Sequence, residues 1–347
     1  MKRFLIKLSY TIFPLWLFFI GLVIYHNIVV VPNMRGDLAI LGNIPMKLWY
    51  DRTTDKALQD TILYSDVKKA ETLRSTKCDV LTCGDSFSLL GLYGYQNYLS
   101  HGGFHVLNYA PKDVLLSNPF QNAYNLMRLG YVDSTNVKVL IVESVERCLS
   151  SRVSGLDFEN YMLNEGEETD ETRTPRGRQY LTEANNFLLL RCRKNPVIKF
   201  SMSDSLFSGE RGNDLYVYKD DLYEFSIHDS VRETIHANVG RLFAEAESKG
   251  VKLIMLVCPD KFDVYQDYVM NNPHPRKRIN EDFREIVGDR DDVFIAKEIL
   301  SPYVSAREKD LFYFDDTHWT CKSAKIISDT LTKYVSESFP KPYLLIP

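Results

Sequence analysis

Two short apolar runs constrain the fold of this chain more than any other feature of its sequence. The runs Val137–Glu143 (VKVLIVE) and Val251–Val257 (VKLIMLV) are rich in β-branched and other apolar residues. Each run predicts a strand that is buried on both faces, as in a parallel sheet. Further strands are expected at Asp79–Thr82, His105–Tyr109 and Val293–Ala296.

Helical patterns lie between these strands. His228–Lys249 places apolar residues along one face before Gly250, and Asn118–Gly130 has a proline near its start and a glycine at its end. Further helices are expected at Tyr64–Thr76, Phe87–Ser100, Arg278–Val287 and Cys321–Ser336. Because strands of the parallel type alternate with helices, the fold class is α/β, and we expect a three-layer domain.

The N-terminal stretch has the composition of a membrane helix. No charged side chain occurs in Leu8–Met34, and Phe13–Val31 is rich in Leu, Ile, Phe and Val. About 20 such residues cross the hydrocarbon core of a bilayer. Lys2, Arg3 and Lys7 precede the stretch and favour a cytoplasmic N-terminus. A cleaved signal peptide is the alternative, but the run ends in VVVPNM without a small-x-small site, which favours an uncleaved single-pass anchor.

The rest of the chain is expected to lie outside the cytoplasm. The whole chain is expected to divide into three parts. Residues 1–34 form the cytoplasmic start and anchor, residues 35–63 a tether, and residues 64–347 the α/β domain. Within that domain, residues 150–223 interrupt the alternation and are interpreted as a long insertion, either a functional loop or a variable decoration.

Composition excludes several classes of function. The net charge of −4, without a basic stripe, gives no reason to expect nucleic acid. The six cysteines are scattered and form no C-x-x-C pair, so neither a zinc site nor a redox motif is predicted. We therefore expect no metal and no bound cofactor.

The strongest functional motif follows the first core strand. Gly84, Asp85 and Ser86 turn from that strand into a helical run. This puts the Ser86 hydroxyl at the carboxyl end of a strand, where open α/β sheets bind ligands. Gly-Asp-Ser is also ordinary turn chemistry, so the motif needs a partner base before it indicates catalysis.

A candidate base occurs near the C-terminus, in the sequence FYFDDTHW. His318 follows both Asp315 and Asp316, and it comes after the last expected strand. Loops at the carboxyl ends of strands meet in space, so His318 and Ser86 can share one crevice. His318 would accept the Ser86 proton while one of the two aspartates orients the ring.

Together these motifs resemble the SGNH (GDSL-type) hydrolases, and G-D-S-F with D-T-H-W is similar to the SGNH domains of alginate O-acetyltransferase-like proteins. The segments Glu143–Arg147 and Pro259–Lys261, with Tyr265 downstream, support that branch, and the resemblance covers roughly Asp79 to Thr332 without the insertion. It implies an SGNH/flavodoxin-like fold and favours Asp316 over Asp315 as the triad acid.

The sequence departs from the family at the oxyanion hole. The Gly and Asn that ordinarily supply donors after the second and third strands are missing, and Asn108 or Arg147 is the candidate substitute. Lys261 is a candidate for contact with substrate or for a structural role in its loop. Trp319 either packs against His318 or forms a wall for sugar stacking. In the alginate enzymes, moreover, the Asp-x-His motif precedes the serine, whereas here it follows.

The resemblance implies a membrane-anchored extracytoplasmic enzyme that O-acetylates a cell-surface or secreted polysaccharide, and that is periplasmic in a Gram-negative source. It further implies that a separate multi-spanning membrane protein delivers the acetyl group. Two alternatives remain open from the residues alone. One is a carbohydrate acetylesterase of the same fold, and the other is a non-catalytic polysaccharide-binding or assembly subunit.

Overall fold

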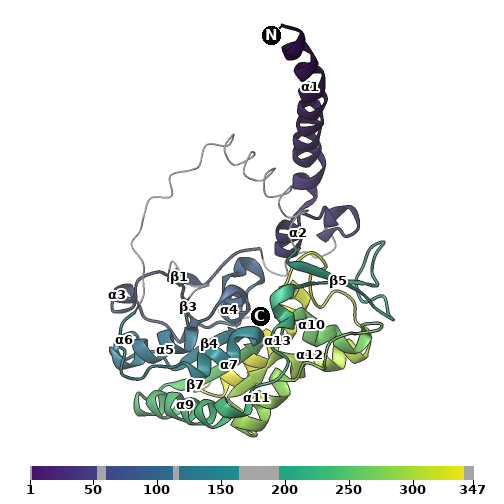
Figure 1. Cartoon of the computed structure of the whole chain (residues 1–347). Helices are drawn as coiled ribbons and strands as arrows, with labels where there is room; N and C mark the ends of the chain where they lie inside the picture. The colour runs from purple at the N-terminus through teal and green to yellow at the C-terminus, as the bar shows by residue number, and fades with distance from the viewer. Residues whose placement is uncertain (1, 53–59, 112–116, 164–194, 340–347) are drawn as a thin grey trace.

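An apolar helix stands apart from an α/β domain in this chain (Figure 1). The computed structural model describes residues 2–52, 60–111, 117–163 and 195–339. Helix α1 (Lys2–Tyr25) continues through a short π-helical turn (His26–Val30), and the span 6–33 is long and apolar enough to cross a membrane. The expected N-terminal apolar helix is confirmed.

The domain is built on a six-stranded sheet in which all neighbouring strands are parallel. The order of its strands is β1-β3-β2-β4-β7-β8. Their bounds are β1 Ser65–Val67, β2 Val80–Cys83, β3 Val106–Tyr109, β4 Val139–Val145, β7 Lys252–Cys258 and β8 Val293–Ile295. Without the edge strand β1, this is the doubly wound order of flavodoxin-like folds, and its switch point lies at β2.

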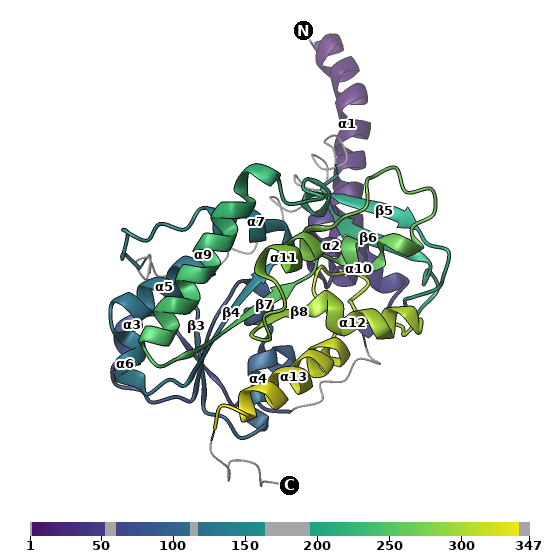
Figure 2. The same cartoon turned by 90° about the horizontal axis from the view of Figure 1, so that it is seen from below.

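Helices cover both faces of this sheet (Figure 2). On one face lie α5 and α9, together with α3, α6, α7 and α11; α4, α12 and α13 lie on the other. The helix bounds are α2 Asp37–Gly42, α3 Ala70–Leu73, α4 Tyr95–His101, α5 Pro119–Arg128, α6 Tyr131–Thr135, α7 Glu146–Ser154, α9 Asp229–Ser248, α10 Lys261–Tyr265, α11 Ile279–Val287, α12 Ala296–Ser305 and α13 Cys321–Ser336. The expected three-layer α/β fold is therefore confirmed.

The side chains of the inner strands β2, β4 and β7 alternate between two hydrophobic cores. On β2, for example, Val80 belongs to the core under α4 and α13, whereas Leu81 belongs to the core under α5 and α9. Val139 and Leu140 divide in the same way on β4. Successive side chains of a strand point to opposite faces, so a strand buried on both faces reads as the continuous apolar run seen in the sequence.

Two helix predictions were wrong in their details. Tyr64–Thr76, predicted as a surface helix, forms the edge strand β1 and the short helix α3, because Val67 pairs with Tyr109 of β3. Phe87–Ser100, predicted as one helix, begins with two 3-10 turns (Ser86–Leu89 and Gly91–Tyr93) before α4. Gly91 has φ +59°, a left-handed conformation that ends the first turn.

The predicted insertion is described only in part. Its acidic and basic runs lie within residues 164–194, outside the described residues. The described part adds an antiparallel ribbon of β5 (Val197–Ser201) and β6 (Asp214–Tyr218), which contacts α2 and α10. Val197 and Leu215 of this ribbon join the core under α4 and α13.

Candidate functional site

Ser86 lies where the topology of an α/β sheet favours a ligand. It follows β2, the strand at the switch point, and begins the first 3-10 turn with its side chain half-buried. Among the described residues, none hydrogen-bonds to the Ser86 hydroxyl or accepts from its backbone N–H. Both groups are therefore open to a bound molecule.

The turn before Ser86 is held by buried carboxyl groups. The Glu143 Oε2 atom accepts from the Asp85 N–H and from the Ser88 hydroxyl, both at 2.9 Å. A Cβ at Gly84 would lie 2.4 Å from that same oxygen, so only glycine fits this approach. Burial, together with the nearby Asp85 charge, raises the pKa of Glu143 well above its usual range.

Asp85, the central residue of the Gly-Asp-Ser motif, is structural. Its carboxylate accepts from the Val145 N–H at 2.9 Å and pairs with Arg152 at 2.5 Å. Burial opposes its ionisation, but Arg152 and the hydrogen bonds hold the pKa of Asp85 below its ordinary value. These contacts fix the turn that carries Ser86 against the start of α7.

His318 is oriented by Asp316. The Nδ1 atom of His318 lies 2.6 Å from Asp316 Oδ1, and the His318 N–H donates to the same oxygen at 3.1 Å. Although burial opposes it, the hydrogen bond to His318 holds the pKa of Asp316 far below its usual range. An ionised carboxylate can only accept, so Nδ1 carries a proton, and in the neutral ring Nε2 presents a lone pair. Burial lowers the pKa of His318, but the bond to Asp316 and its charge raise it overall.

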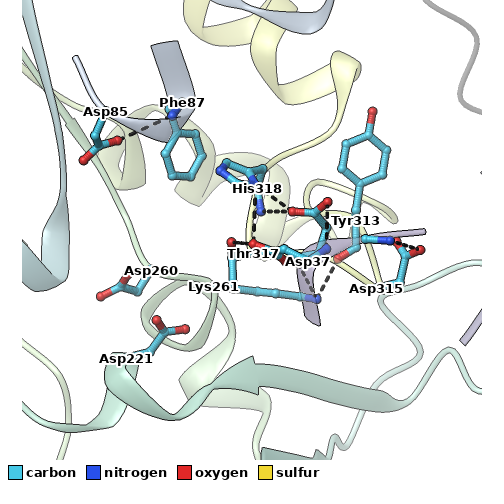
Figure 3. A network of polar contacts seen from close by, with 12 residues as sticks. Asp37, Asp85, Phe87, Asp221, Asp260, Lys261, Tyr313, Asp315, Thr317 and His318 are labelled. Carbon is cyan, nitrogen blue, oxygen red and sulfur yellow. Dashed lines mark hydrogen bonds and ion pairs between the residues drawn. The ribbon is translucent and has the colours of Figure 1, made fainter. Parts of the chain in front are cut away.

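The ring nitrogen that would act as a base is unoccupied. His318 Nε2 is buried and has no hydrogen-bond partner among the described residues. The Phe87 ring, on the residue next to Ser86, lies against the His318 ring with centroids 4.8 Å apart (Figure 3). The structure thus brings the neighbour of Ser86 into contact with His318, while no hydrogen bond joins the Ser86 hydroxyl to Nε2.

The two aspartates before His318 differ in their partners. Asp315 is buried and accepts from the Arg52 side chain at 2.6 and 2.9 Å and from the Gly36 N–H at 3.0 Å. Asp316 alone bonds to the imidazole. This geometry favours Asp316, the residue that the D-T-H-W resemblance also favoured.

Lys261 is buried beneath residues 313–318, the loop that carries Asp316 and His318 and that we call the histidine loop. Its Nζ atom donates to the backbone carbonyls of Tyr313, Phe314 and Asp316 at 2.6, 2.9 and 3.1 Å (Figure 3). Burial lowers the pKa of Lys261 to about 7. The side chain that the sequence offered as a contact for substrate therefore holds the backbone of the loop that carries Asp316 and His318.

Three other candidate residues are engaged inside the fold. The Asn108 amide donates to Asp66 Oδ1 at 2.8 Å and to the Ser88 carbonyl at 3.0 Å, which uses both of its N–H groups. Arg147 pairs with Asp260 at 2.7 Å and Asp221 at 3.4 Å. Trp319 is fully buried against Phe87, with ring centroids 4.4 Å apart, which matches packing rather than a wall for sugars.

Sequence reasoning missed three residues of this site, namely Gly36, Asp37 and Arg52. All three lie in the segment interpreted as a tether, and all contact Asp315, Asp316 or Thr317. No local periodicity links these residues to the histidine motif. The only signals were the charges of Asp37 and Arg52 in a stretch of mixed polarity. Glu143 and Arg152 were missed as partners of Asp85 for the same reason.

One group of side chains has the ligand types of a metal site. Ligand atoms of Asp37, Asp316 and His318 all lie within 4.8 Å of one another. Asp316 already bonds to His318, and Asp37 bonds to Thr317, so these contacts hold the three side chains in place.

The site thus combines a parallel sheet in a three-layer α/β domain with an Asp316–His318 pair that follows the last strand of that sheet. Comparison with known proteins finds a partial match to one family. Residues 215–344 match the family described as "SGNH hydrolase-like domain, acetyltransferase AlgX". Over 134 residues the chain is 26% identical to a Pseudomonas fluorescens protein named "Probable alginate O-acetylase AlgJ". No solved structure matches the chain.

These matches support the resemblance to the alginate O-acetyltransferase-like branch, and they also limit how much of the chain it covers. The alignment covers 37% of this chain and 34% of the relative, so the chain spans about a third of the length of the curated relative that it matches. The matched family segment contains Lys261, Asp316 and His318 but not Ser86. It is narrower than the extent expected from the motifs, which began at Asp79.

Proposed function

We propose that this protein is a membrane-anchored extracytoplasmic O-acetyltransferase that acts on a cell-surface or secreted polysaccharide. Ser86 is its nucleophile, His318 its general base and Asp316 the residue that orients the base. The observation that carries the proposal is the Asp316–His318 pair, whose Nε2 atom has no partner among the described residues and whose ring lies against Phe87. The match to an acetyltransferase family and to a protein named as an alginate O-acetylase supports the choice of reaction and of substrate class.

The steps of the reaction follow from which atoms of these side chains carry protons. Nε2 takes the proton of the Ser86 hydroxyl as its oxygen forms a bond to the acetyl carbonyl carbon, and the imidazolium is stabilised by Asp316. Nε2–H then protonates the departing donor group as its bond to the acetyl carbon breaks, which leaves acetyl-Ser86. A sugar hydroxyl attacks this ester by the same steps in reverse. The Ser86 N–H is the first candidate donor to the oxyanion.

The remaining site residues receive secondary roles. Lys261 positions the histidine loop from below through its bonds to the loop carbonyls. Arg147, whose side chain is 22% exposed, is the candidate for contact with the polysaccharide. Asn108 and Trp319 support the Ser86 turn and the Phe87 ring from inside the fold.

The apolar helix α1 supports the proposed location. It would hold the domain at the outer face of a membrane, next to a multi-spanning protein that delivers acetyl groups, as the family resemblance implies. A signal sequence has the same composition, so the test is the N-terminus of the mature protein. An uncleaved Met1 in the membrane fraction supports the anchor, and a new N-terminus near residue 34 contradicts it.

The direct test of the reaction uses full-length protein in detergent, an activated acetyl ester and a non-acetylated oligosaccharide such as an alginate fragment. Wild type is expected to form an acetylated serine and acetylated oligosaccharide, and Ser86→Ala and His318→Ala are expected to form neither. Free acetate without acetylated sugar would instead identify an acetylesterase. Activity that survives in Ser86→Ala would overturn the proposed nucleophile.

One observation favours a second candidate, a non-catalytic polysaccharide-binding subunit. Both candidates for the second oxyanion donor, Asn108 and Arg147, are engaged with other groups. A serine-directed fluorophosphonate separates the two functions. Labelling of wild type but not of Ser86→Ala supports the enzyme, whereas unlabelled wild type that still binds oligosaccharide supports the binding subunit.

A further inference from the structure

The segment that follows the apolar helix is built into the histidine loop, although the two are far apart in the sequence. Gly36 and Asp315 are separated by 279 residues, and Arg52 and Asp315 by 263. We call Gly36, Asp37 and Arg52 the brace. Its residues hydrogen-bond to Asp315, Asp316 and Thr317, which carry the candidate base on the following position.

Gly36 allows the brace to approach the loop closely. Its N–H donates to Asp315 Oδ2 at 3.0 Å, and a Cβ at this position would lie 1.9 Å from the Asp315 carbonyl oxygen. Three residues later, the Ala39 N–H donates to that carbonyl at 3.1 Å. The segment 36–39 therefore hydrogen-bonds to both the side chain and the backbone carbonyl of Asp315.

Arg52 joins the two aspartates of the loop. Its guanidinium donates to Asp315 Oδ1 through two nitrogens and to Asp316 Oδ2 at 3.0 Å, and it lies over the Tyr313 ring at 3.9 Å. A planar fork makes several bonds in fixed directions, which the ammonium of lysine cannot reproduce. Arg52 therefore fixes the direction in which Asp316 presents its other oxygen to His318.

Asp37 is the third element of the brace. Its carboxylate accepts from the Thr317 N–H at 2.7 Å and from the Thr317 hydroxyl, and one of its oxygens lies 3.8 Å from His318 Nδ1 (Figure 3). Its own N–H lies 3.4 Å from Asp316 Oδ2. Asp37 is thus a second carboxylate beside the protonated nitrogen of the candidate base.

We propose that Asp37 and Arg52 are positioning residues of the acyl-transfer site, which hold Asp316 and His318 in the geometry that activates Ser86. This inference rests on the proposed function. The first residues after the apolar helix are then part of the active site and not a passive tether. Arg52 acts through Asp316, and Asp37 acts through Thr317 and through its charge beside His318.

The charged groups around His318 set the direction of the expected pH effect. Asp316 and Asp37 raise the pKa of His318, whereas burial and Arg147 lower it. Arg52 and Lys261 face Asp316 from its other sides. Removal of the Asp37 charge should therefore lower the pKa of His318. Because the base acts when neutral, the acid limb of the rate profile should move to lower pH.

The experiment compares two pairs of variants in the full-length protein in detergent. Asp37→Asn and Arg52→Lys change the brace. Their matched controls are Asp51→Asn and Arg35→Lys, an exposed ion pair at 3.5 Å in the same segment, with side chains 51% and 41% exposed. The readouts are kcat and KM for acetyl transfer between pH 5 and 9, the unfolding midpoint, and the NMR titration of His318 in labelled protein.

We expect Arg52→Lys to lower kcat on the order of 100-fold with little change in KM. We expect Asp37→Asn to move the acid limb, and the titration of His318, down by about 1 pH unit. The controls should match wild type. If Ser86→Ala and His318→Ala abolish turnover while both brace variants match their controls, the positioning role is overturned and the proposed function stands. If Ser86→Ala remains active, the proposed function fails, and an unchanged His318 titration in Asp37→Asn then overturns the inference independently.

Discussion

Among the described residues of this domain two lysines are fully buried, and they differ in what surrounds them. Lys261 donates to three neutral carbonyls of the histidine loop, whereas Lys277 donates to the Asp260 carboxylate at 2.8 Å and to the Asp221 carbonyl at 2.7 Å. Burial lowers the pKa of Lys261 to about 7. It also opposes the charge of Lys277, but the Asp260 carboxylate raises that pKa above its ordinary value of 10.5.

This difference predicts that Lys277 serves mainly the fold and Lys261 mainly the candidate site. Lys277 belongs to a buried charge cluster with Arg147, Asp260, Asp221 and Glu146. A charge within such a cluster mainly compensates other buried charges, so its loss leaves one of them unpaired. Lys261 compensates no charge directly, and what it holds is the backbone that presents Asp316 and His318. The first should therefore matter most for folding and the second most for activity.

The largest effect is expected from Lys277→Met. This change leaves Asp260 paired only with Arg147 and adds no compensating group, so it should lower the free energy of unfolding by about 3–5 kcal/mol. Urea denaturation of the detergent-solubilised protein measures this loss. Lys325→Met, at an exposed lysine paired with Asp329, is the control and should stay within about 0.5 kcal/mol. A loss below about 1 kcal/mol for Lys277→Met would contradict the structural role.

The next effect is expected from Lys261→Met. Methionine fills similar volume but releases the carbonyls of Tyr313, Phe314 and Asp316, and the resulting shift of the Asp316–His318 pair should lower kcat on the order of 100-fold. Its loss of unfolding free energy should be smaller than that of Lys277→Met, because the cost of burying the cation disappears with it. Acetyl-transfer kinetics beside urea denaturation tests this ordering. Full activity with severe destabilisation would reverse the roles assigned to the two lysines.

A smaller effect distinguishes the lysines by pH. Lys261 has a folded pKa of about 7 against an ordinary 10.5, so between these values the unfolded chain binds more protons than the folded one. Its contribution to stability is therefore present above 10.5 and is lost as the pH falls toward 7, with a slope of at most about 1.4 kcal/mol per pH unit. Lys277 behaves oppositely, and its contribution is present below 10.5 and is lost at higher pH.

The measurement is the free energy of unfolding of wild type and Lys261→Met between pH 7 and 10. The difference between the two curves should grow in favour of wild type as the pH rises. A flat difference would mean that Lys261 stays protonated throughout this range, held by its carbonyls.

The smallest effect is expected from Arg147→Lys, at the partly exposed edge of the charge cluster. Lys277 still pairs with Asp260 in this variant, so the free energy of unfolding should fall by no more than about 1 kcal/mol. If Arg147 contacts the polysaccharide, KM for the oligosaccharide should rise while kcat stays constant. An unchanged KM would assign Arg147 to the cluster alone.

The sheet could largely be predicted from the sequence, because a buried parallel strand is recognisable from its own residues. Strands buried on both faces must be apolar throughout, and Val137–Glu143 and Val251–Val257 show this directly. The motif also predicted that His318 pairs with one of the two aspartates before it, and the resemblance to D-T-H-W favoured Asp316, the residue that the ring contacts. The edge strand β1 was missed because three residues of mixed polarity gain their structure only from pairing with β3.

The brace could not be read from the sequence for a different reason. Contacts of Gly36 and Arg52 with Asp315 join the two ends of the chain, and no periodicity in either segment encodes the other. Lys261 shows a related limit. Its position after β7 was apparent, but whether its ammonium pointed to a ligand or to loop carbonyls depends on the fold around it.

The brace also determines when the candidate site can assemble during synthesis of the chain. Gly36 emerges from the ribosome 279 residues before Asp315, and at about 5–20 residues per second that interval is roughly 15–60 s. Until Asp315 follows, no chain terminated early can assemble the histidine loop on its support. On the proposed function, truncated products that end before His318 lack the candidate base and should transfer no acetyl group.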